Sequence, residues 1–184
     1  NMIQDEDEKH EMTQVCERVL TIRNTQVIID RDVADIYGVA TRDINKAVKN
    51  NPNKFPEGYI IELTDSEKHE LVENFHRFGS LKHSTVMPKA FTEKGLYMLA
   101  TILKSPVATE ATIAIIETFT KIRVLARAIE DANNGNGQPE TNKLQQLMTE
   151  VFTNNLPVQM KKTPFTINTG FIKFSVETTR KKEE

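Results

Sequence analysis

The sequence has only one cysteine, Cys16, and lacks any long hydrophobic run. A single cysteine excludes an internal disulfide and fits a reducing cytoplasm. A helix that crosses a bilayer needs about 20 mostly apolar residues, so we expect no membrane segment. The pattern of a secretory signal peptide, a basic stretch followed by an apolar core, is also absent. We therefore expect a cytoplasmic protein.

Motifs for catalysis and for cofactor binding are also missing. There is no phosphate-binding GxxxxGK[ST] loop, no GxGxxG and no HExxH, and no Ser or Cys lies in a recognisable nucleophile elbow. His69, His76 and His83 are spaced by seven, which on one helix would form a ligand stripe. However, Gly79 and Ser80 interrupt that helix, and no cysteine or acid pair completes a site. We expect no enzymatic activity, no metal and no cofactor.

The most informative segment present is residues 30–49, DRDVADIYGVATRDINKAVK, which fits the helix-turn-helix template. Gly38 stands where the first helix needs a left-handed residue at its C-terminus. Val39 fills the turn, and Thr41 is expected to cap the second helix. In that second helix Ile44 and Val48 face inward. The template also occurs in proteins that never touch DNA, so the outward residues decide its interpretation.

The outward face of the second helix carries residues suited to a major groove, in which Arg and Lys bind guanine or phosphate and Asn binds adenine. Residues 41–54 contain four basic residues and one acid. We predict that Arg42, Asn45 and Lys46 reach base edges. The predicted phosphate contacts are Thr41, Lys49 and Lys54.

Charge is distributed unevenly along the 184 residues, although the net charge is only −2. Residues 1–17 carry six acids and one lysine, whereas residues 18–127 carry 16 basic and 13 acidic groups. We expect residues 1–17 to form an acidic, solvated, mobile tail. The alternative is that this tail competes with DNA phosphate for the basic face.

The remaining pattern predicts a mixed α+β fold built from short elements. The expected elements are a hairpin of residues 19–22 and 27–29, a strand at 59–63, a helix from the capping box at Thr64 to Phe75, a loop at 77–85, an edge strand at 86–91 marked by Pro88, a helix capped by Thr92, and a long helix from Pro106 to about residue 131.

The long helix carries more apolar residues than one small domain needs at its far end. Its stripe recurs at alternating three- and four-residue intervals. One interpretation is that the whole stripe is buried in the domain core. The other is that Ile122, Leu125 and Ile129 form the interface of a homodimer.

The C-terminal part is expected to be an appendage. Residues 132–138 are rich in Asn and Gly and predict a flexible linker. Residues 139–184 predict a helix followed by a hairpin, too small to hold much core alone. We expect residues 18–131 to be the DNA-binding domain and residues 139–184 to be an interaction module.

Residues 54–56, Lys-Phe-Pro, and residues 88–99, PKAFTEKGLYML, resemble the phage-type ORF-six N-terminal domain, a DNA-binding family akin to KilA-N. The resemblance spans roughly residues 19–127. Most relatives would have Gln at Lys94 and Asn at Thr112, and neither departure threatens the fold. The resemblance implies a cytoplasmic DNA-binding regulator of a bacterium or prophage.

Two functions follow from the sequence. The first is a sequence-specific transcription regulator that binds double-stranded DNA as a homodimer. The alternative is an antirepressor or interaction module that binds a regulatory protein, with residues 139–184 as a candidate contact. Strong salt dependence distinguishes the first from the second, because DNA binding releases condensed counterions.

Overall fold

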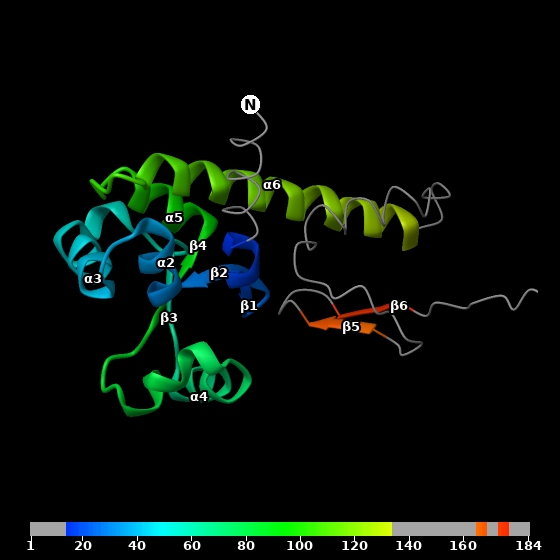
Figure 1. Ribbon diagram of the computed structural model, residues 1–184, viewed down its shortest axis with the longest axis horizontal. Helices are drawn as coiled ribbons and strands as arrows, with labels where there is room; N and C mark the ends of the chain where they lie inside the picture. Colours follow the sequence, from blue (N-terminus) through cyan, green and yellow to red (C-terminus); the bar gives the residue numbers. More distant parts are fainter. Residues whose placement is uncertain (1–13, 134–164, 169–172, 177–184) are drawn as a thin grey trace, which may run out of the picture.

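The computed structural model describes residues 14–133, 165–168 and 173–176 (Figure 1). Residues 14–18 are helical, and Val15 is buried in the core at 2% exposure. Residues 14–17 therefore belong to the folded domain rather than to the expected tail. The fold is α+β, as predicted, and no helix in the described ranges is long and apolar enough to cross a membrane.

A four-stranded antiparallel sheet lies at the centre of the domain. Its strands are β1 (Leu20–Ile22), β2 (Thr25–Ile29), β3 (Ile60–Glu62) and β4 (Lys89–Thr92), in the order β1-β2-β4-β3. The predicted hairpin is confirmed, but its second strand begins at Thr25 and not at Val27. Arg23 and Asn24 form the turn, with φ of 51° and 59°, as a two-residue turn of the primed type requires.

The expectation of an edge strand at residues 86–91 is wrong. β4 pairs with both β2 and β3, so it is a central strand. Pro88 lies just before the strand begins, where its missing N–H removes no ladder hydrogen bond. The proline marks the start of the strand, not an edge.

The sheet separates two hydrophobic clusters because side chains alternate between its faces. On one face, Ile28 and Phe91 pack with the helical residues 30–37, 41–50, 93–100 and 108–133. On the other face, Val27, Ile29 and Ala90 pack with the segment between β3 and β4. Both central strands are therefore covered on both sides.

The segment predicted to be a helix-turn-helix forms two helices joined by a short turn, α2 (Asp30–Tyr37) and α3 (Thr41–Asn50). Gly38 has φ +62° and ends α2 in the left-handed conformation, as expected. The cap of α3 differs from the prediction by one residue. Ala40 is the N-cap, in extended conformation, and Thr41 is already the first helical residue. No side chain caps the start of α3.

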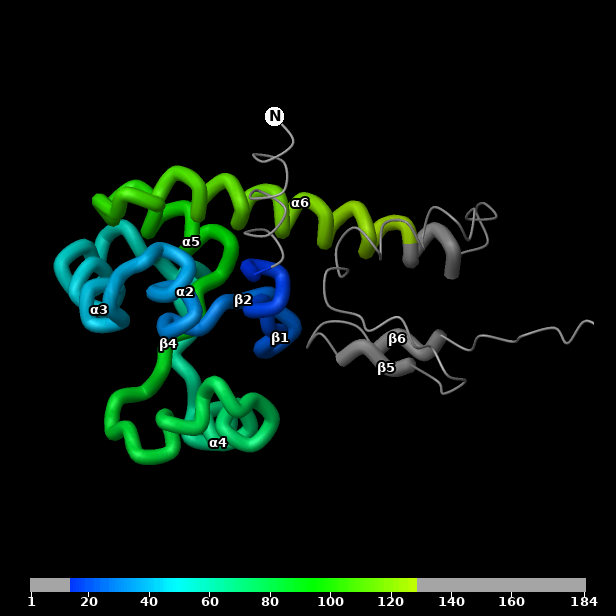
Figure 2. Tube along the Cα trace, in the orientation of Figure 1, coloured from blue at the N-terminus to red at the C-terminus, as the bar shows by residue number. Residues whose placement is uncertain are grey.

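The segment between β3 and β4 forms a lobe that Figure 2 shows below the sheet, joined to it by these two strands. It contains α4 (Asp65–Asn74), which was expected, and the 3₁₀ segment η2 (His76–His83). The sequence predicted only a loop in place of η2. The capping box of Thr64 and Glu67 is confirmed. Phe78 and Leu81 of η2 are buried, which explains why this segment is ordered. A shorter 3₁₀ turn, η1 (Pro52–Lys54), follows α3.

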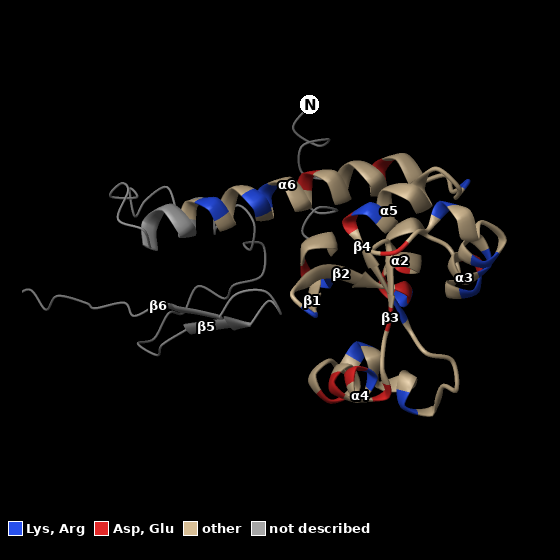
Figure 3. Cartoon of the chain, turned by 180° about the vertical axis from the view of Figure 1, so that it is seen from behind, with Lys and Arg blue, Asp and Glu red and all other residues tan. Residues whose placement is uncertain are grey.

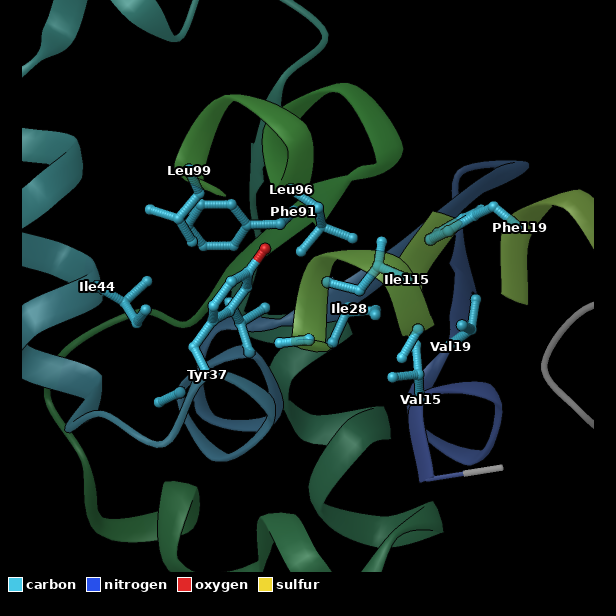
Figure 4. Packing of buried hydrophobic residues seen from close by; sticks show 14 of the residues in the cluster. Val15, Val19, Ile28, Tyr37, Ile44, Phe91, Leu96, Leu99, Ile115 and Phe119 are labelled. Atoms are coloured by element: carbon cyan, nitrogen blue, oxygen red, sulfur yellow. The ribbon is translucent and has the colours of Figure 1, made fainter. Parts of the chain in front are cut away.

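Helices α5 (Glu93–Ala100) and α6 (Ala108–Asn133) cover the other face. Thr92 caps α5 by accepting from the Gly95 N–H, as predicted. Ser105 Oγ donates to the carbonyl of Tyr37, joining the start of α6 to the end of α2. Figure 4 shows Ile115 and Phe119 of α6 among the buried side chains of this core.

The C-terminal residues in the described ranges form β5 (Phe165–Asn168) and β6 (Lys173–Val176), paired antiparallel. This confirms the two strands of the expected terminal hairpin. Since α6 extends to Asn133, residues 132–133 are helical and not part of the predicted linker. The helix predicted after residue 138 lies outside the described residues.

Candidate nucleic-acid interface

The helix α3 separates its apolar and basic residues as its sequence predicts. Ile44 is fully buried, and Val48 packs against the same core cluster. The side chain of Arg42 is 89% exposed, and Lys46 and Lys49 are exposed as well. Figure 3 shows Lys and Arg positions in blue along α3, at the edge of the domain. The basic face of α3 is therefore available to a partner.

Lys54 is exposed at the end of η1, directly after α3. The next residue, Phe55, packs edge-on against Phe91 of the central strand, with ring centroids 6.4 Å apart. That contact holds the turn against the core, so Lys54 continues the basic surface of α3 from a fixed position.

Asn45 differs from its basic neighbours because its amide already has partners. Asn45 Nδ2 donates to the Thr41 carbonyl at 3.2 Å and lies 3.5 Å from Asp30 Oδ2. Lys89 Nζ donates to Asn45 Oδ1 at 3.1 Å, and the Lys89 N–H donates to Asp30 Oδ2 at 3.3 Å. The start of β4, the start of α2 and the middle of α3 thus meet at one polar cluster.

Asp30 occupies the buried end of this cluster, at 3% exposure. Burial raises the pKa of its carboxyl, and the hydrogen bonds from Lys89, Asn45 and the Arg31 backbone oppose that rise. Sequence reasoning missed both Asp30 and Lys89. No local signal could have found Lys89, because it is 44 residues away from Asn45 in the chain.

A second buried carboxylate, Asp32, lies two residues further along α2 at 3% exposure. Arg77 Nε of η2 lies 3.1 Å from Asp32 Oδ2, and Arg18 Nε lies 3.9 Å from Asp32 Oδ1. Burial raises the pKa of Asp32, whereas Arg77 and then Arg18 lower it. This carboxylate therefore connects α2 to the lobe and to the helical residues 14–18.

The histidines and the cysteine are not brought together in the described part of the chain. His69 is on α4, where its Nε2 lies 3.0 Å from Glu73, whereas His76 and His83 are at the two ends of η2. No group of three or more metal-ligating side chains occurs among the described residues. Burial raises the pKa of the Cys16 thiol to about 11, which disfavours the reactive thiolate.

The two residues expected at a dimer interface whose side chains are described, Ile122 and Leu125, are not exposed on the protomer. Ile122 and Leu125 are only 9% and 2% exposed within the protomer. The side chain of Ile129, the third expected residue, is not among those that the structure describes. The side chains of Ile122 and Leu125 are therefore already covered within the protomer, and the homodimer remains a prediction. The exposed apolar side chains of α6 are instead Ile113, Ile116 and Val124.

The comparisons with known proteins agree with the resemblance seen in the sequence. Residues 17–102 match the family model of the ORF6N domain. The matched region includes the sheet, the helix-turn-helix, the lobe and α5, whereas α6 follows it. No curated protein and no solved structure matches the chain.

Proposed function

The chain carries a phage-type ORF6N domain in residues 17–102, and on this premise we propose that it is a sequence-specific DNA-binding protein that regulates transcription. The observation that carries the proposal is the division of α3. Ile44 is fully buried, while Arg42, Lys46 and Lys49 are exposed along the helix. A helix-turn-helix places such a second helix in the major groove of B-DNA.

The exposed residues take different roles because of their positions along α3. Arg42 and Lys46 are one helical turn apart and address neighbouring base pairs. Lys49 and Lys54 lie further along and contact phosphates, as does Thr41 at the start of the helix. We keep Asn45 as a base contact. This role requires its amide to exchange the hydrogen bonds with Thr41 and Lys89, at 3.2 and 3.1 Å, as well as the 3.5 Å contact with Asp30, for bonds to a base.

A homodimer is part of the proposal, with a different interface from the one that the sequence indicated. Ile113, Ile116 and Val124 of α6 are 49%, 41% and 45% exposed. They lie at three- and eight-residue intervals, on the side of α6 opposite to Ile115 and Ile122. A second copy of this helix would cover that stripe by hydrophobic burial.

The experiment is a set of DNA titrations over a range of salt concentrations, using duplexes selected from random DNA. Arg42→Ala should weaken the selected site by about 1–3 kcal/mol and relax preference at one base pair. Lys49→Ala should weaken all sequences alike and reduce the log–log salt slope by about one per protomer. Lys94→Ala, an exposed lysine on α5 outside the helix-turn-helix and outside the exposed stripe of α6, is the matched control and should bind as wild type does.

The same titrations distinguish the proposed function from the alternative one. An antirepressor that binds a regulatory protein would show little DNA affinity and a much weaker salt dependence. If Arg42→Ala and Lys49→Ala bind DNA as wild type does, α3 does not read DNA. The module formed by residues 139–184 would then become the first place to search for a protein partner.

A further inference from the structure

The η2 segment is basic and is held against the helix-turn-helix. Its sequence, HRFGSLKH, contains Arg77 and Lys82 and no acid. The Arg77 guanidinium lies over the rings of Phe75 and Phe78, at 5.0 and 4.5 Å from their centroids. These ring contacts and the ion pair with Asp32 fix its position. Ser80 accepts a hydrogen bond from Arg31 of α2, which joins the two elements a second time.

A cleft of about 420 Å³ opens between η2 and the helix-turn-helix. Its lining residues come from four parts of the fold and are Arg18, Arg31, Asp32, Asp35, Thr41 and Arg77. Since a water molecule occupies about 30 Å³ in the liquid, the cleft has room for a phosphodiester group and its hydration. Thr41 is the first residue of α3, so the cleft reaches the end of the helix that we propose to read DNA.

The charges in this cleft are not equally neutralised. Asp32 is paired with Arg77 and Arg18, and Asp35 lies 4.0 Å from Arg18. Among the described residues, no carboxylate lies within ion-pair distance of Arg31, whose hydrogen-bond partner is the Ser80 hydroxyl. The uncapped N-terminus of α3 adds partial positive charge at the same place. Arg31 and this helix end together favour an anion.

We propose that this cleft binds a phosphate of the DNA backbone and that η2 is a second contact surface for the duplex that α3 reads. The proposal rests on the proposed function and extends it to Arg31, Arg77 and Lys82. The first helix of a helix-turn-helix crosses the DNA backbone, and Arg31 lies in the first turn of α2. Lys82, exposed on η2, contacts a neighbouring phosphate.

The experiment measures DNA affinity of the full chain against salt for Arg31→Ala, Lys82→Ala and the double variant. Each single variant should weaken a selected and an unrelated duplex by the same factor and reduce the log–log slope by about 0.9 per protomer, which is about 1.8 for the homodimer. The double variant should reduce the slope by about 3.6 for the homodimer. Lys94→Ala is again the control. Ethylation interference should show one phosphate whose modification harms wild type but no longer harms Arg31→Ala.

The outcomes separate this inference from the proposed function. If wild type binds DNA and responds to Arg42→Ala, but Arg31→Ala and Lys82→Ala keep the wild-type slope, the second surface is wrong and the α3 interface stands. If wild type shows no salt-dependent DNA binding, both proposals fail. Should Arg31→Ala fail to fold, Arg31→Gln takes its place, because its amide can still donate to Ser80 but carries no charge. Lys82→Ala tests only the contribution of η2, since Lys82 does not line the cleft.

A final arm distinguishes DNA phosphate from free phosphate. Inorganic phosphate should compete with DNA no better than chloride at matched ionic strength, because one small anion makes few of the contacts that the duplex makes. Specific competition that Arg31→Ala abolishes would identify a small-anion site and overturn the assignment to DNA.

Discussion

Replacing Gly95 by alanine tests whether helix propensity, which favours alanine, or steric overlap with neighbouring backbone, which disfavours it, determines stability at this position. Gly95 is the third residue of α5, and its N–H donates to the capping Thr92 Oγ1 at 3.3 Å. A Cβ at this position would lie 2.1 Å from the Tyr59 carbonyl oxygen and 3.1 Å from its carbon. That oxygen also accepts from the N–H and the hydroxyl of Thr92, both at 3.1 Å. The carbonyl cannot move away without breaking these bonds.

Helix propensity alone predicts that Gly95→Ala stabilises the protein by about 1 kcal/mol. Overpacking against backbone costs about 1–3 kcal/mol, and loss of the Thr92 cap costs about 1 kcal/mol more. The balance is a loss of about 1–3 kcal/mol. For a domain of this size the melting temperature should fall by at least about 3 °C.

Urea unfolding followed by circular dichroism measures this loss directly. The matched control is Gly79→Ala in η2, where an added Cβ meets no atom within 4 Å and φ is not positive. The control should be as stable as wild type or slightly more stable. If Gly95→Ala were equally stable, the close approach of α5 to residue 59 would be wrong.

Two further predictions concern self-association and acid stability. Ile113→Glu combined with Val124→Glu should convert a dimer into a folded monomer in sedimentation equilibrium, and a monomeric wild type at micromolar concentration would contradict the interface. Arg23, whose Nε lies 2.8 Å from Glu67, lowers the pKa of Glu67 to about 2. This pair therefore stabilises the fold above the ordinary pKa of 4.5 and loses its effect as the pH falls towards 2. Glu67→Gln should flatten the decrease in stability between these pH values, whereas Glu70→Gln on the same helix should not.

The elements that sequence predicted well depend on partners only a few residues away. Gly38 ends α2, Thr64 forms a capping box with Glu67, and Thr92 caps α5. The position of β4 in the sheet depends instead on pairing with β2 and β3, which lie far away in the chain. Pro88 gave only local information, and that is why the strand was wrongly assigned to an edge.

The candidate site also depends on contacts between residues far apart in the chain, which the sequence could not predict. Helical periodicity predicted which residues of α3 face outward, but it could not show that Lys89 contacts Asn45 or that Arg31 contacts Ser80 from 49 residues away. Periodicity also identified the apolar stripe of α6 without showing what covers it. Leu125 is buried by its own chain, so an apolar surplus in the sequence did not correspond to an exposed surface.

The buried carboxylates of Asp30 and Asp32, at the start of α2, explain why the basic residues of α3 and η2 keep fixed positions relative to each other. Burying a charge is costly, and a well-packed apolar side chain often stabilises as much as a buried ion pair. Stability alone therefore gives little reason for Asp30 and Asp32. Their bonds are directional: Asp30 accepts from the backbone of Lys89, and Asp32 from Arg77 of η2. These bonds orient α2 against both the sheet and the lobe. A duplex that contacts α3 and η2 together requires that orientation, since phosphate positions along DNA are set by its helical repeat.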